Sequence, residues 1–178
     1  MKKTVLRMMA AILTCGLATS VIASCGSDDD SITPSAQFNK IVVECSAEAT
    51  QSTIDVFNVK PYYPDNSGNT TIETMTGTTW TKTIEIPASK TPCSLEYYIL
   101  VIPKDPNGET SDLTFGKGSK IVVTTFDSKG HIISTKERAR SMITEEVQDG
   151  INLKTFAKEQ NNNEEKITFN IDKSGKVS

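Results

Sequence analysis

The residues that could support acid–base chemistry offer little sign of a catalytic site. His131 is the only histidine, and it directly follows Gly130 at the start of an expected strand. It could act as a general base, but a half-exposed residue at a strand end is the simpler interpretation. The sequence has no GxSxG, HExxH or Walker motif, and residues 116–120 lack phosphate-loop spacing and are interpreted as a turn. We therefore expect no catalytic residue and no enzyme activity.

Two loops place oxygen-bearing side chains at alternate positions, as a calcium site would. One holds Asp65, Ser67 and Asn69, and the other spans residues 105–109. Both lack the glycine and the glutamate that an EF-hand loop needs at its sixth and twelfth positions. We interpret them as plain turns, and we expect neither a bound metal nor a cofactor.

Aromatic side chains are the candidates for ligand contact, because an exposed ring can stack on a sugar or pack against a protein. Tyr62 and Tyr63 lie between two prolines, on what we expect to be a rigid exposed loop. The alternative is that both tyrosines seal an edge of the core. Trp80 shares a strand face with Ile84 and Ile86, which predicts a core position.

Cys45 and Cys93 are predicted to point inward from two separate strands. They could form a disulfide in an oxidising compartment, provided that their Cα atoms lie within about 7 Å. The alternative is a pair of buried free thiols. Metal binding is disfavoured because the chain has no CxxC pair.

Residues 1–24 have the three-part pattern of an export signal. Lys2, Lys3 and Arg7 precede the uncharged stretch 8–17, and small residues close the segment. This stretch is shorter than the roughly 20 apolar residues that a membrane span needs. A buried N-terminal helix is the alternative, but the basic residues and Gly16 do not favour it.

The segment Ile22-Ala23-Ser24-Cys25 resembles the bacterial lipobox. This resemblance implies cleavage before Cys25 and attachment of lipid to its thiol. Each buried methylene contributes about 0.8 kcal/mol, so two or three acyl chains would hold the protein at a membrane.

The acidic segment after Cys25 resembles the export signal of surface lipoproteins in the Bacteroidetes. In that signal, Ser27 followed by Asp28, Asp29 and Asp30 would direct an outer-membrane lipoprotein to the cell exterior. The alternative is that these aspartates only begin a solvated linker, and that the protein faces the periplasm. Asp30-Ser31-Ile32 is similar to the O-glycosylation site of that phylum, which makes Ser31 a candidate.

Charge and length describe what the export signal would leave behind. Three of the 19 basic residues lie in the signal and none of the 22 acidic ones do, so the remainder carries a net charge of about −6. Such a chain is a poor partner for nucleic acid. We expect residues 25–37 to form a tether and residues 38–178 to form one domain with a real core.

From Phe38 onward, apolar and β-branched residues alternate with period two, which is typical of strands. This pattern predicts an all-β fold, an antiparallel and immunoglobulin-like sandwich of about seven strands. The expected strands are 39–47, 52–59, 78–86, 95–102, 120–126, 131–136 and 166–171.

The stretch from Ser141 to Gln160 is ambiguous. Ile143 and Val147 have helical spacing and Gly150 could end a helix, so we expect one short helix near 143–149. Residues 151–157 alternate and could add a strand.

Three functions fit these features. The first is a non-enzymatic binding or accessory module for a glycan or a protein ligand, anchored to a membrane through its N-terminal lipid. The second is a structural or adhesive envelope component that associates with itself or with an envelope protein through a sheet edge. The third, a hydrolase, would need a pocket with converging acids.

Overall fold

The computed structural model describes residues 37–162, 164 and 166–178 of the chain. The predicted export signal, Cys25, the acidic segment and Ser31 lie outside these residues. The strands are β1 (Phe38–Ala49), β2 (Phe57–Pro64), β3 (Thr70–Ile72), β4 (Thr79–Pro87), β5 (Cys93–Pro103), β6 (Glu109–Asp127), β7 (Ile132–Asn152) and β8 (Ile167–Ile171). The helices are α1 (Gln51–Val56), α2 (Leu153–Asn162) and the short 3-10 helix η1 (Ala88–Lys90).

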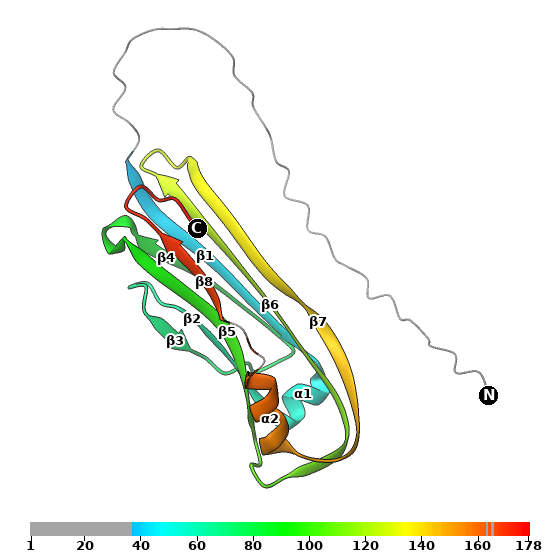
Figure 1. Ribbon diagram of the computed structural model, residues 1–178. Helices are drawn as coiled ribbons and strands as arrows, with labels where there is room; N and C mark the ends of the chain where they lie inside the picture. The colour runs from blue at the N-terminus through cyan, green and yellow to red at the C-terminus, as the bar shows by residue number, and fades with distance from the viewer. Residues whose placement is uncertain (1–36, 163, 165) are drawn as a thin grey trace, which may run out of the picture. The chain divides into compact units, whose positions relative to one another are not determined.

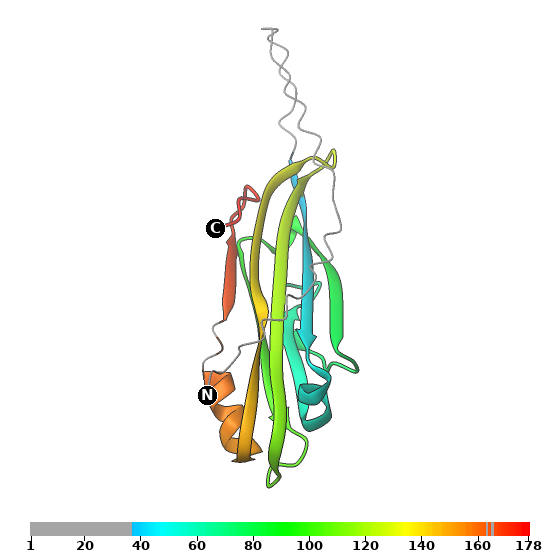
Figure 2. The same ribbon diagram turned by 90° about the vertical axis from the view of Figure 1, so that its right-hand side faces the viewer.

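The strands form two four-stranded antiparallel sheets that pack face to face (Figure 1). Sheet one has the order β4-β1-β6-β7, and sheet two has the order β3-β2-β5-β8. The predicted all-β, antiparallel sandwich is therefore confirmed. Figure 2 shows the β6–β7 hairpin running the length of sheet one, with β8 and α2 on the side of β7.

Alternation along the strands builds the core. In β1, Ile41, Val43 and Cys45 point inward and are at most 2% exposed, whereas Glu44 between them is exposed. The same alternation in β5 buries Leu95 and Tyr97. Burying one such side chain contributes about 1.5–3 kcal/mol, so period-two patterning drives the association of the two sheets.

The strand expected over 52–59 is wrong in its first half. Residues 51–56 form α1, and β2 begins only at Phe57. Thr50 caps the helix, because its hydroxyl accepts a hydrogen bond from the backbone N–H of Thr53. The Thr53 hydroxyl is fully buried and accepts from the N–H of Gly116 in β6. This tertiary contact favours a helical turn over the strand preference of the local residues.

The helix expected near 143–149 is also wrong, because these residues belong to β7. They pair with β6, with Leu113 opposite Val147 and Phe115 opposite Glu145. The helix begins at Leu153 instead, and it replaces the strand that alternation over 151–157 suggested. Its buried residues, Leu153, Phe156 and Ala157, have the i, i+3, i+4 spacing of one helix face.

Cys45 and Cys93 are free thiols in the structure. Cys45 lies in β1 of sheet one, and Cys93 begins β5 of sheet two, at the margin of the same core cluster. The structure therefore has the pair of unbridged thiols and not the disulfide. Burial raises the pKa of Cys45 to about 12, which makes it an inert core residue. Within the described residues, no helix is long and apolar enough to cross a bilayer.

Candidate functional site

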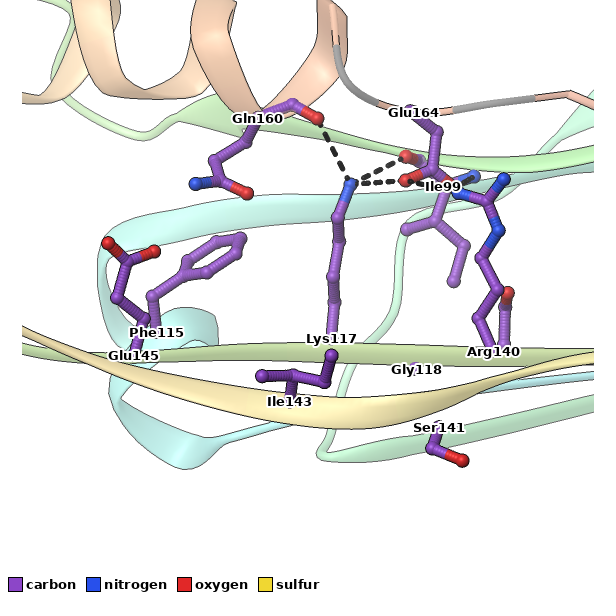
Figure 3. Close-up of a pocket in the computed structure, with 11 residues that line it drawn as sticks. Ile99, Phe115, Lys117, Gly118, Arg140, Ser141, Ile143, Glu145, Gln160 and Glu164 are labelled. Carbon is purple, nitrogen blue, oxygen red and sulfur yellow. Dashed lines mark hydrogen bonds and ion pairs between the residues drawn. The ribbon is translucent and has the colours of Figure 1, made fainter.

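A cleft opens along one side of the sandwich, where β6 and β7 face β5 and the segment that follows α2 (Figure 3). It encloses about 450 Å³, which is within the range of small-ligand sites. Its lining combines apolar and polar side chains. The lining residues are Ile99, Phe115, Lys117, Gly118, Ser119, Arg140, Ser141, Ile143, Glu145, Gln160 and Glu164.

Lys117 crosses the cleft from sheet one to sheet two. Its ammonium group lies 2.6 Å from a carboxylate oxygen of Glu164 and 3.4 Å from the backbone carbonyls of Ile99 and Gln160. The side chains of Lys117 and Glu164 are only 13% and 7% exposed. Because three acceptors surround the three N–H donors of Lys117, this residue acts as a strut that joins the sheets.

Glu164 and Asn161 cover the part of β5 that β8 does not reach. Glu164 accepts a hydrogen bond from the backbone N–H of Ile99 at 3.2 Å. Asn161 bonds both the N–H and the carbonyl of Val101, at 2.9 and 2.8 Å, as a neighbouring strand would. These side chains satisfy a sheet edge that would otherwise be open, and they fix the rim of the cleft.

The remaining lining residues determine what the cleft can bind. Ile143 is 80% exposed and offers an apolar contact at the mouth. Arg140 lies 3.8 Å from Glu164 and is one-third exposed, so part of its guanidinium group faces the cleft. Glu145 and Gln160 add a carboxylate and an amide. An apolar patch beside several donors and acceptors suits a polar ligand that has one apolar face.

The cleft was not predicted from the sequence, because residues 116–120 were interpreted as a turn. They lie inside β6, where Gly118 makes close contacts. A Cβ atom on Gly118 would lie 2.6 Å from a carboxylate oxygen of Glu48 and 2.9 Å from the backbone nitrogen of Met142. The sequence does contain one indication of this site. Lys117 places a charge in the inward-facing series of β6 that also contains the buried residues Phe115 and Ile121.

The tyrosines predicted to lie on an exposed loop belong to strand β2, and they point in opposite directions. Tyr63 faces the core and is 4% exposed. Tyr62 lies on the outer face of sheet two, where its ring stacks on Tyr98 with centroids 4.5 Å apart. Lys166 approaches the Tyr98 ring at 5.0 Å. These contacts occupy ring faces that a sugar would need, so the outer face is a weaker candidate than the cleft.

Glu73 ties the two sheets together on the β3–β4 side of the sandwich. It accepts hydrogen bonds from the Tyr63 hydroxyl, from Trp80 Nε1 at 2.9 Å and from Lys82 Nζ at 2.7 Å. The bonds from Lys82, Tyr63 and Trp80 lower the pKa of Glu73 to about 2. Trp80 is half-buried against both core clusters, so its aromatic ring serves packing.

The other sequence candidates have local roles. His131 is 74% exposed, and its Nδ1 lies 3.0 Å from a carboxylate oxygen of Asp127 across the β6–β7 turn. Asp65 accepts hydrogen bonds from the backbone of Ser67 and Asn69, as expected for a plain turn. Within the described part of the chain, no group of three His, Cys, Asp or Glu residues could hold a metal ion.

No family model, curated protein or solved structure matches this chain.

Proposed function

We propose that this chain is a membrane-anchored, cell-surface lipoprotein whose β-sandwich is a non-enzymatic binding module. The observation that supports the proposal is the cleft beside Lys117, which combines an exposed apolar contact with several hydrogen-bonding groups. Its ligand is a glycan. A sugar ring has an apolar C–H face that fits Ile143, and its hydroxyls fit Arg140, Glu145 and Gln160. A protein segment is the other ligand that this lining could hold.

Binding at the cleft is tested by two matched substitutions on β7. Ile143→Asp removes the apolar contact at the mouth of the cleft. Ile133→Asp makes the same change on the same strand, at a 40% exposed residue that does not line the cleft. We expect the full chain to bind members of an immobilised panel of neutral and acidic oligosaccharides. Ile143→Asp should weaken this binding about tenfold or more, and Ile133→Asp should leave it within about twofold.

Two outcomes of that experiment would contradict the proposal. One is that the full chain binds no oligosaccharide of the panel. The other is that the two isoleucine substitutions weaken binding equally.

The membrane anchor is supported by the lipobox-like segment that ends at Cys25. Cells supplied with labelled palmitate should produce a labelled protein, and Cys25→Ala should remove the label and release the protein from the membrane fraction. Cys45→Ala is the matched control, because this thiol is buried in the core and should not affect labelling. Labelling that persists in Cys25→Ala would disprove the proposed anchor.

A self-associating envelope component is the second candidate function, and strand β7 favours it. β7 is 21 residues long, forms one edge of sheet one and exposes Ile132, Ile133, Met142 and Ile143. Long apolar edges can pair with another chain. Polymers that grow with protein concentration would select this function. A hydrolase remains a remote alternative.

The immunoglobulin-like type of sandwich remains a prediction. The two antiparallel sheets support the architecture that such domains share with other sandwiches. In the immunoglobulin fold the first strand pairs with the second, whereas here β1 pairs with β4 and β6.

A further inference from the structure

Three cations lie side by side on the inner face of β7. Lys136, Arg138 and Arg140 are paired in register with Val123, Ile121 and Ser119 of β6, which are all buried. Residues opposite each other in an antiparallel pair point to the same face of the sheet. The three cations therefore project toward the space between β7 and β8, the same side on which the cleft opens.

A second hollow continues the cleft along this side. It also encloses about 450 Å³, and it adjoins the cleft at Arg140, which lines both. Its other lining residues come from β7 and from the start of β8. They are Arg138, Ala139, Lys166, Ile167 and Thr168. Together the two hollows form a trough with basic residues along one half.

Among the described residues, the acids of the trough lie in its cleft half or are already paired. Glu145 lines the cleft, Glu164 is engaged by Lys117 and Arg140, and Glu96 lies 3.3 Å from Lys166. Glu137 belongs to the opposite face of β7, where it pairs with Lys120. Among residues 37–162, 164 and 166–178, no acid forms an ion pair with Lys136 or Arg138. The half of the trough beside Arg138 and Lys136 therefore concentrates positive charge, in a chain whose net charge is −3.

We propose that the ligand of this trough is an acidic polysaccharide, whose carboxylates lie along Arg138 in the second hollow and along Lys136, which lies next to it on the same face of β7, while one sugar ring occupies the cleft. The proposal rests on the proposed glycan-binding function and names its ligand class. A trough with two adjoining hollows suits a linear polymer better than a flat membrane surface. A row of so few cations is short for nucleic acid, which needs many phosphate contacts. Arginine binds carboxylates in a planar, two-pronged geometry, which lysine does not reproduce.

The test compares oligogalacturonate with a neutral gluco-oligosaccharide of equal length, using the full chain and isothermal titration. We expect the acidic oligomer to bind about tenfold more tightly or better. Its affinity should fall at least about threefold between roughly 50 mM and roughly 200 mM salt. Arg138→Gln and Lys136→Gln should each lower the affinity for the acidic oligomer about fivefold. Arg138→Lys keeps the charge and should lower this affinity less than Arg138→Gln.

Lys120→Gln is the matched control, because it removes the same charge from the opposite face of sheet one. It should change the affinity less than about twofold. If the neutral oligomer binds equally well and Ile143→Asp still weakens it, the acidic ligand is refuted while the glycan-binding function stands. If neither oligomer binds, both proposals fail. Binding of an acidic peptide, single-stranded DNA or anionic vesicles more tightly than oligogalacturonate would also overturn the inference. So would a loss of affinity in Lys120→Gln equal to that in Arg138→Gln.

Discussion

Replacing Glu164 with alanine is expected to lower the free energy of unfolding by about 3 kcal/mol. The substitution removes the carboxylate that pairs with the Lys117 ammonium group, whose side chain is 13% exposed. It also removes the acceptor for the backbone N–H of Ile99. A buried charge without a counter-charge is costly, because desolvation is no longer offset. Urea denaturation of the full chain, followed by circular dichroism, measures the change.

Two further variants show whether the buried ion pair is the cause. The double variant Lys117→Met and Glu164→Leu removes both charges and should recover much of the lost stability. Glu85→Ala breaks the exposed pair with Lys40, whose side chains are 61% and 38% exposed, and should cost less than about 1 kcal/mol. If Glu164→Ala lowers the free energy of unfolding no more than Glu85→Ala does, the buried Lys117–Glu164 pair does not stabilise the packing of the two sheets.

Acid is expected to destabilise the β3–β4 side of the sandwich by protonating Glu73. Its pKa in the folded protein is about 2, below the ordinary value of 4.5. The folded state therefore favours the ionised carboxylate. The resulting stabilisation is present above pH 4.5 and is lost as the pH falls toward 2. The urea midpoint of the unmodified chain should fall steeply across this window.

Glu73→Gln should flatten that pH dependence, because glutamine does not titrate. It should also lower the stability near neutral pH, since an amide is a weaker acceptor for Lys82 and Trp80 than a carboxylate. Glu85→Gln is the control, because the Glu85 carboxylate pairs with Lys40 at the exposed surface. An unchanged acid slope in Glu73→Gln would show that other carboxylates govern the response.

Much of the fold follows from local pattern. Strands β1, β4, β5 and β8 were predicted to within about two residues, because each alternates between a buried and an exposed face. The predictions of secondary structure are wrong where a contact with a residue distant in the sequence determines the local conformation. Gly116 bonds to Thr53 and favours α1, and pairing with β6 makes a strand of Ile143 and Val147 although their spacing also suits a helix.

The cleft could not be predicted, because its parts come from distant places in the chain. Lys117 and Glu164 are 47 residues apart, and their contact depends on how sheet one packs over sheet two. The sequence does contain a charged residue in an inward-facing apolar series, but not its partner. The opposite directions of Tyr62 and Tyr63 follow from strand alternation, which Pro61 and Pro64 obscured.

Isoleucine-methyl NMR of the labelled full chain, titrated with oligogalacturonate, tests the binding site most directly. Ile99 and Ile143 line the cleft, whereas Ile72 and Ile102 are exposed and are paired in register with Tyr62 and Asn58 in sheet two. We expect the ligand to shift the Ile99 and Ile143 signals and to leave those of Ile72 and Ile102 unchanged. Shifts confined to Ile72 and Ile102, or no shifts at all, would contradict binding at the cleft.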